Sequence, residues 1–160
     1  MKNITYILCI LCFIASTFLN AQTKDRDYFT FYKGGEKYLK PVKYILFDSL
    51  QRNTERKKDK QKIYFHIMGE SFVHNKNYTV DTCAINYLQK IKLDNPADLQ
   101  DNAYKYFKKK KQEEERKTNK KIPVLNPVTG FSPYFKVYIL EKSNNNKVIK
   151  YEVDWEYSSF

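Results

Sequence analysis

The segment at residues 134–157 constrains the fold more than any other part of this chain. Its second half alternates without a break between apolar and charged side chains: Ile149, Tyr151, Val153, Trp155 and Tyr157 form one set, and Lys150, Glu152, Asp154 and Glu156 form the other. Successive side chains of a strand point to opposite faces, so this pattern predicts a strand with one buried face and one polar face. Residues 134–143 are also rich in strand formers, and three asparagines follow them. We therefore predict a C-terminal β-hairpin.

The loop of this hairpin is expected to contain an odd number of residues. An even loop would set Ile139 opposite Lys150 and mix apolar with charged side chains on both faces. An odd loop keeps one continuous apolar face and predicts these pairs: Ile139 with Ile149, Val137 with Tyr151, Phe135 with Val153, and Lys136 with Glu152 on the polar face. The turn is then 143–145, or that loop with its flanks, and an asparagine takes a positive φ.

Further strands are predicted upstream from runs of β-branched and aromatic residues. We expect strands at 28–32, ending at Gly34-Gly35, at 42–47 in a central position, and at 62–68, ending at Gly69. A small hairpin is expected to pair 72–74 with 78–80. Residues 50–61 lack apolar periodicity, which favours an exposed helix or a loop, and 81–93 favours a short helix or an irregular turn.

One long helix is predicted at 96–118. Asn95 precedes Pro96, which combines a capping side chain with the residue type favoured at the first helical position. The apolar residues recur at the spacing of a single helix face, and they are Leu99, Ala103, Tyr106 and Phe107. Beyond Phe107 the sequence is charged but rich in helix formers. Residues 122–133 contain three prolines and are expected to form a constrained loop against the body of the protein.

These elements predict an α+β fold. We expect an antiparallel sheet of about five to seven strands, with the long helix packed on one of its faces and the C-terminal hairpin closing the core. Residues 22–160 amount to 139 residues and include 23 aromatic residues, which fits a single domain with one apolar core.

Residues 1–21 have the organisation of a secretory leader. Lys2 lies in a short polar start, an apolar run extends from Ile4 to Phe18, and Ala21 precedes the polar Gln22. The run of 15 residues is shorter than the roughly 20 apolar residues of a membrane span. We predict export to the periplasm or the extracellular space after cleavage near Ala21, with an uncleaved anchor as the alternative, and no membrane-spanning helix in the mature chain.

Cleavage would leave Cys83 as the single cysteine of the mature chain. An internal disulfide is then excluded, and the thiol is either buried or available for an intermolecular disulfide. Burial is the favoured alternative, because isolated structural cysteines behave as small apolar residues.

The excess of positive charge is confined to two segments, 52–62 with a net charge of +4 and 105–121 with +6, while the rest of the mature chain is balanced. The candidate contact residues for a polyanion or a partner are Lys57, Lys58, Lys60, Lys108, Lys109, Lys110 and Lys111. The chain has 25 lysines and four arginines. Arginine is the residue suited to bidentate phosphate recognition, so this composition disfavours nucleic acid as the partner.

Catalytic chemistry has little support in the sequence. The two histidines, His66 and His74, lie in predicted strands, and Glu70, Asp81 and Cys83 near them match no spacing known for metal ligands. Ser71 or Cys83 is a conceivable nucleophile beside a histidine, but Ser71 lacks the glycine pattern of a nucleophile elbow. We therefore assign no catalytic residue, no metal ligand and no cofactor, and we favour a protein that is not an enzyme.

Three functional hypotheses follow from these observations. The first is a small exported, non-enzymatic protein that contacts the cell envelope or a macromolecular partner through its basic segments. The second is an inhibitor-like or structural protein that pairs with a partner chain through a sheet edge. The third is a small hydrolase that uses His66 or His74. The identity of the partner or substrate, the biological process and the oligomeric state do not follow from the sequence.

Overall fold

The computed structural model describes residues 40–123, 130–143 and 145–157, which belong to the compact unit Lys40–Phe160. The predicted leader, the strand at 28–32 and the Gly34-Gly35 turn lie outside the described residues. Within the described residues, no helix is long and apolar enough to cross a membrane.

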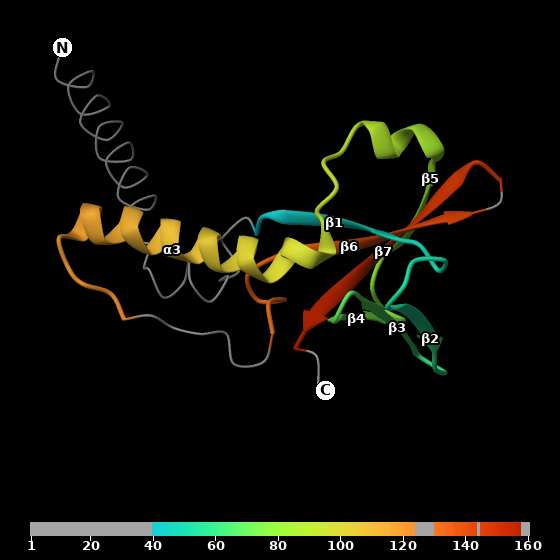
Figure 1. The fold of residues 1–160 in the computed structure, drawn as a ribbon, viewed down its shortest axis with the longest axis horizontal. Coiled ribbons are helices and arrows are strands. Elements are labelled where there is room, and N and C mark those ends of the chain that lie inside the picture. Colours follow the sequence, from blue (N-terminus) through green and yellow to red (C-terminus); the bar gives the residue numbers. More distant parts are fainter. Residues whose placement is uncertain (1–39, 124–129, 144, 158–160) are drawn as a thin grey trace, which may run out of the picture. The chain divides into compact units, whose positions relative to one another are not determined.

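The fold is α+β, as predicted, with a seven-stranded and mostly antiparallel sheet, one long helix and a C-terminal hairpin (Figure 1). The strands are β1 Val42–Phe47, β2 Thr54–Lys58, β3 Lys62–Ile67, β4 Glu70–Asn75, β5 Val80–Ala84, β6 Lys136–Ser143 and β7 Lys147–Glu156. The helix α3 spans Leu99–Thr118, and two short 3₁₀ helices, η1 Ile85–Gln89 and η2 Pro96–Asp98, lie between β5 and α3.

Strand β7 is the centre of the sheet. Of its ten residues, 147–153 pair with β6 along one edge. The other edge is shared by β5, at 147–151, and β4, at 154–156. The predicted hairpin of 72–74 with 78–80 is therefore wrong. The turn after Asn75 does form, because the N–H of Tyr78 donates to the carbonyl of Asn75 over 2.8 Å. It redirects the chain along β7 instead of back onto β4, because β7 is long enough to offer ladder partners to both segments.

The hairpin of β6 and β7 has the predicted odd loop but a different register. Ile139 pairs with Tyr151 and Val137 with Val153, two residues away from the predicted partners. A shift of two residues keeps every side chain on its predicted face, so the apolar face is preserved. The positive φ falls on Asn146, at 52°. Lys136 still reaches Glu152, 3.2 Å away, although Tyr138 is the residue directly opposite Glu152.

The structure corrects two other predictions, and both concern strands at the ends of the strand order. Strand β1 pairs in parallel with β6 and stands at one end of the order among the described residues, not in a central position. Strand β2 stands at the other end, in the segment for which we expected a helix or a loop. Its pairing with β3 supplies the hydrogen bonds, so β2 needs no apolar periodicity of its own.

The sheet is curled, which brings strands together that are distant in the strand order. Phe47 of β1 contacts Phe65 of β3, with ring centroids 5.3 Å apart. On the same face, Arg56 of β2 forms an ion pair of 3.1 Å with Glu141 of β6. The concave face therefore encloses the main core, in which Phe65, Ile139 and Trp155 are fully buried.

The helix α3 covers one part of this core. Asn95 accepts a hydrogen bond from the N–H of Ala97, as expected of a cap before a helix. Three of the four predicted apolar residues are buried, namely Leu99, Ala103 and Phe107. Phe107 contacts the rings of Phe135 and of Phe131, which precede β6. Phe131 is fully buried, so this part of the 122–133 loop does lie against the core, whereas residues 124–129 are outside the described residues.

The face of the hairpin that we expected to be polar carries a second, smaller apolar cluster. Leu140 and Val148 on this face are fully buried. Tyr44 stacks on Tyr138 beside them at 5.5 Å, and the Tyr87 ring of η1 meets Tyr44 edge-on. The η1 segment thus covers the end of the sheet nearest the hairpin turn, and both faces of the sheet are packed there.

Candidate functional site

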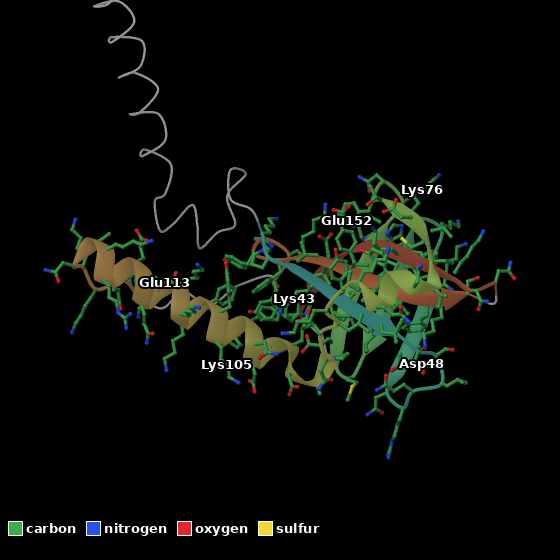
Figure 2. The ribbon with its side chains drawn as sticks, turned by 90° about the horizontal axis from the view of Figure 1, so that it is seen from above. Lys43, Asp48, Lys76, Lys105, Glu113 and Glu152 are labelled. Carbon is green, nitrogen blue, oxygen red and sulfur yellow. The ribbon has the colours of Figure 1, made fainter. Side chains whose placement is uncertain are left out.

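The charged half of α3 separates its side chains into two faces. One face continues the side of the helix that carries the buried Leu99, Ala103 and Phe107, and its side chains, including Lys110, Glu113 and Glu114, are half-buried. The opposite face is exposed. Figure 2 shows Lys105 on the half of α3 nearer the sheet and Glu113 on the half farther from it. This separation follows from the 3.6-residue repeat of the helix, which places residues three and four apart on the same face.

The glutamates of α3 are engaged by lysines on their own face of the helix. The pairs are Lys110 with Glu113 at 2.9 Å, Lys111 with Glu115 at 3.7 Å, and Lys117 with Glu114 at 3.9 Å. The hydrogen bond from Lys110 lowers the pKa of the Glu113 carboxyl below its usual value of 4.5. Glu115 also accepts a hydrogen bond of 2.9 Å from the N–H of Ile122, in the chain that follows the helix.

The opposite face of α3 carries cations without such partners. Lys105, Lys108, Lys109 and Arg116 are exposed, and none of them forms an ion pair with another residue in the described part of the chain. Their spacing of three, four and seven residues aligns them along the helix. We call these four residues the α3 basic stripe.

The structure divides the predicted contact residues of the 105–121 segment. Lys108 and Lys109 lie on the stripe, whereas Lys110 and Lys111 are half-buried and ion-paired. Lys105 and Arg116 were not predicted, although the helical repeat applied to the charged residues would have identified them. Lys110 and Lys111 were selected because they belong to a run of four lysines, and a run in sequence is spread around a helix.

The 52–62 segment presents its cations differently. Lys58 and Lys60 are exposed at the end of β2 and in the turn that follows, and Lys57 pairs with Glu55 at 3.1 Å. Arg56 points to the concave face, where it contacts Glu141. The segment is therefore a charged edge strand, and its cations do not form a single line.

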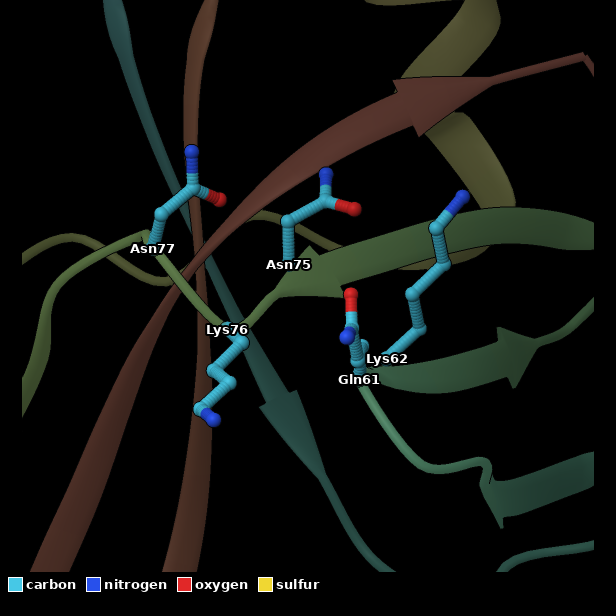
Figure 3. A pocket seen from close by; sticks show the side chains of 5 residues that line it. All are labelled: Gln61, Lys62, Asn75, Lys76 and Asn77. Carbon is cyan, nitrogen blue, oxygen red and sulfur yellow. The ribbon is translucent and has the colours of Figure 1, made fainter.

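A polar pocket lies where the turn between β2 and β3 meets the turn between β4 and β5 (Figure 3). The N–H of Lys76 donates to the carbonyl of Gln61 over 2.9 Å and holds the two turns together. The lining residues are all polar and include two lysines: Gln61, Lys62, Asn75, Lys76 and Asn77. The pocket thus extends the basic surface of the 52–62 segment. Lys76 contributes a further positive charge to this surface, although it lies outside the segment in sequence.

The residues considered for catalysis are dispersed. His66 and His74 point to opposite faces of the sheet, because His66 pairs with Ser71 whereas His74 pairs with Ile63. His74 is buried, and its Nδ1 lies 2.8 Å from the carbonyl oxygen of Glu152, which can act only as an acceptor. Glu70 is also buried, where it accepts a hydrogen bond of 2.7 Å from the Trp155 indole N–H.

The structure does bring Ser71 to His66. The Ser71 hydroxyl lies 3.1 Å from His66 Nδ1, since the two residues are directly opposite on β3 and β4. Ser71 is 8% exposed, which restricts the access of a substrate to its hydroxyl. Glu55, the next residue across the sheet, pairs with Lys57. We interpret the Ser71–His66 contact as a cross-strand hydrogen bond that stabilises the sheet.

Metal binding finds no support in the described residues, in which no three side chains of His, Cys, Asp or Glu converge. The acidic residues of β7 have structural partners: Asp154 accepts a hydrogen bond of 2.6 Å from the Tyr78 hydroxyl, and Glu152 accepts one of 2.7 Å from the Thr79 hydroxyl. Cys83 is a half-buried free thiol, so the expected full burial is not observed. No family model, no curated protein and no solved structure matches this chain.

Proposed function

We propose that this protein is an exported, non-enzymatic binding protein that docks on the polyanionic surface of the cell envelope through the α3 basic stripe. The observation that carries the proposal is the segregation of charge on α3. The glutamates pair with Lys110, Lys111 and Lys117, which leaves four aligned cations facing outward. A line of like charges on a rigid helix creates a local positive potential that attracts an extended anionic surface.

The chemistry of the stripe favours a surface over a specific small ligand. Three of its four cations are lysines, which act as hydrated point charges and impose little geometry on the anion. The exposed line continues through Gln112. Tyr104, the exposed aromatic residue beside it, packs edge-on against Phe107 and Phe131 and is held against the core. Binding of this kind is peripheral, and it weakens as salt screens the charges.

Export is part of the proposal and rests on the secretory leader that the sequence predicts at 1–21. Anionic headgroups and acidic polysaccharides of an envelope are then the polyanions that the protein meets. Nucleic acid is disfavoured as the partner because of the scarcity of arginine.

The test is binding of the purified protein to anionic phospholipid vesicles, to neutral vesicles and to an immobilised acidic polysaccharide over a series of salt concentrations. The variant Lys105→Gln, Lys108→Gln, Lys109→Gln, Arg116→Gln removes the stripe. Each basic residue near an anionic surface contributes about 1 kcal/mol, so we expect the variant to bind roughly 100- to 1000-fold more weakly, with a shallower salt dependence.

A matched control removes the same amount of charge elsewhere. Lys90, Lys92, Lys142 and Lys147 are exposed and dispersed over other elements, and their replacement by glutamine changes the net charge equally. This control is expected to bind nearly as well as the wild-type protein. Equal weakening of both variants would show that net charge suffices, and absence of binding to every anionic surface would contradict the proposed function itself.

A further inference from the structure

Three strands have an edge without a strand partner among the described residues: β1, β2 and β5. The β1 edge is covered by Asp94, whose N–H donates to the Tyr44 carbonyl over 2.8 Å and whose carboxylate accepts from the Tyr44 N–H over 3.3 Å. The β2 edge consists of four consecutive charged residues at 55–58. Covering segments and charged side chains are the usual means by which sheet edges avoid pairing with another chain.

Strand β5 has neither form of protection. Val80, Thr82, Cys83 and Ala84 are uncharged, and the single charge of the strand, Asp81, is engaged by Lys150 at 2.7 Å. Except for the half-buried Cys83, the side chains of β5 are exposed, and Val80 is 49% exposed. An exposed edge whose single charge is already paired is a template for a further strand.

The hydrogen-bond pattern identifies the groups that point outward. The Glu152 N–H donates to the Thr79 carbonyl, and the Ile85 N–H donates to the Asn146 carbonyl, each over 3.0 Å. In an antiparallel ladder every second residue bonds to the neighbouring strand, so Asp81 and Cys83 direct their backbone groups toward β7. The backbone N–H and carbonyl of Thr82, the residue between Asp81 and Cys83, point away from β7 and have no partner within the sheet.

We propose that two copies of this chain associate edge to edge through β5, antiparallel, with the two-fold axis at Thr82. Each Thr82 then donates its N–H to the Thr82 carbonyl of the other copy and accepts the reciprocal hydrogen bond. Val80 lies opposite Ala84, and Asp81 lies opposite Cys83. No pair of like charges is directly opposed in this arrangement, so β5 is complementary to itself.

The protection of the other strand edges explains which strand of a second copy is added. The β1 edge is covered by Asp94 and the β2 edge is charged, so neither serves as the added strand. The unguarded strand edge on the described part of the molecule is β5, and pairing with itself joins the two sheets through β7, β5, β5 and β7. A contact over five residues is smaller than a standard stable interface, so we expect an association that depends on concentration.

The test uses charge at the two-fold axis. Thr82→Lys places two lysines opposite each other in the dimer, and Thr82→Glu places two glutamates there. Thr82 is exposed and its backbone does not bond to β7, so both variants are expected to fold as the wild type does, with unchanged circular dichroism. Sedimentation over a concentration series should show the wild-type protein and the control Thr82→Val dimerising, while each charged variant stays monomeric.

Mixing the two charged variants provides the decisive measurement. A lysine opposite a glutamate restores a favourable pair, so the equimolar mixture is expected to form a heterodimer with twice the monomer mass. A wild-type protein that stays monomeric throughout the series would overturn the proposal, as would charged variants that dimerise alone. A mixture that remains monomeric would exclude pairing at Thr82.

Discussion

At the scale of single residues, two glycines illustrate how differently one substitution acts in this fold. Gly130 has a φ of +131°, and a Cβ there would lie 2.6 Å from the carbonyl oxygen of Trp155. Gly69, in the turn between β3 and β4, has a φ of +90°, but a Cβ there meets no atom within 4 Å. Both positions favour glycine by conformation, and Gly130 is constrained by packing as well.

We predict that Gly130→Ala destabilises the protein by about 2–5 kcal/mol, because backbone strain and a clash with the β7 backbone act together. Gly69→Ala is the matched control, with strain and no clash, and should cost about 1–2 kcal/mol. Urea unfolding of the two variants and the wild type measures both values. Equal losses for the two variants would contradict the close approach of Gly130 to Trp155.

For single residues, the buried face of a strand could be predicted from the sequence, whereas contacts with residues distant in sequence could not. Alternation along 149–157 correctly predicted the buried face of β7, because a strand's face is a property of local spacing. The partner of Trp155 was not predicted: the buried carboxylate of Glu70 bonds to its indole, and these residues are distant in sequence. Likewise, the side chain of Arg56 was assigned to the surface because nothing local indicates that Glu141 lies within its reach.

At the scale of elements, helix α3 was predicted well and the edge strands were not. The helix has its own signals, a cap at Asn95 and apolar residues at helical spacing, and both depend on neighbours within a few residues. Strand β2 exists because β3 pairs with it, and the route of β5 along β7 is decided by the length of β7. The α3 basic stripe was predicted only in part. The helix itself was predicted, but its periodicity was not applied to the charged residues.

The polar contacts of Glu152 connect β7 to β6 and to the start of β5. Burial raises the pKa of the Glu152 carboxyl, but the hydrogen bonds from Thr79 and Lys136 outweigh it and leave the pKa below the usual 4.5. A carboxyl whose pKa is lower in the folded state stabilises the fold above its usual pKa. This contribution is lost as the pH falls through the lowered value.

We therefore predict that Glu152→Gln is less stable than the wild type near neutral pH, by about 0.5–1.5 kcal/mol. The difference should persist down to about pH 5 and shrink below the usual carboxyl pKa. Unfolding experiments at several pH values measure this difference, and repeating them in a Lys136→Gln background provides the control. In that background, the stability difference between glutamate and glutamine at position 152 should depend less on pH. An unchanged pH dependence would show that Lys136 does not hold the carboxylate.

At the scale of the whole molecule, the curl of the sheet determines which residues meet. In the order β1-β6-β7-β4-β3-β2, three strands separate β2 from β6, yet Arg56 and Glu141 are in contact across the concave face. The Tyr151 hydroxyl donates to the same carboxylate over 3.1 Å, and the Arg56 guanidinium lies over the Phe65 and Tyr151 rings. Neither this closure nor the parallel pairing of β1 with β6 has a local signature, because both depend on the arrangement of distant strands.

We predict that Arg56→Ala loosens this closure and costs roughly 1–3 kcal/mol, since it removes a charged hydrogen bond and two cation–π contacts and leaves Glu141 without its cation. Lys57→Ala is the matched control in the same strand, because its ion pair with Glu55 is exposed and should contribute less than about 0.5 kcal/mol. Denaturant unfolding gives the two losses, and hydrogen exchange locates them: the amides of β2 and β3 should exchange faster in Arg56→Ala, while those of the β6–β7 hairpin change little. Similar losses in both variants, or faster exchange spread evenly over the sheet, would show that the Arg56–Glu141 contact does not hold the curl.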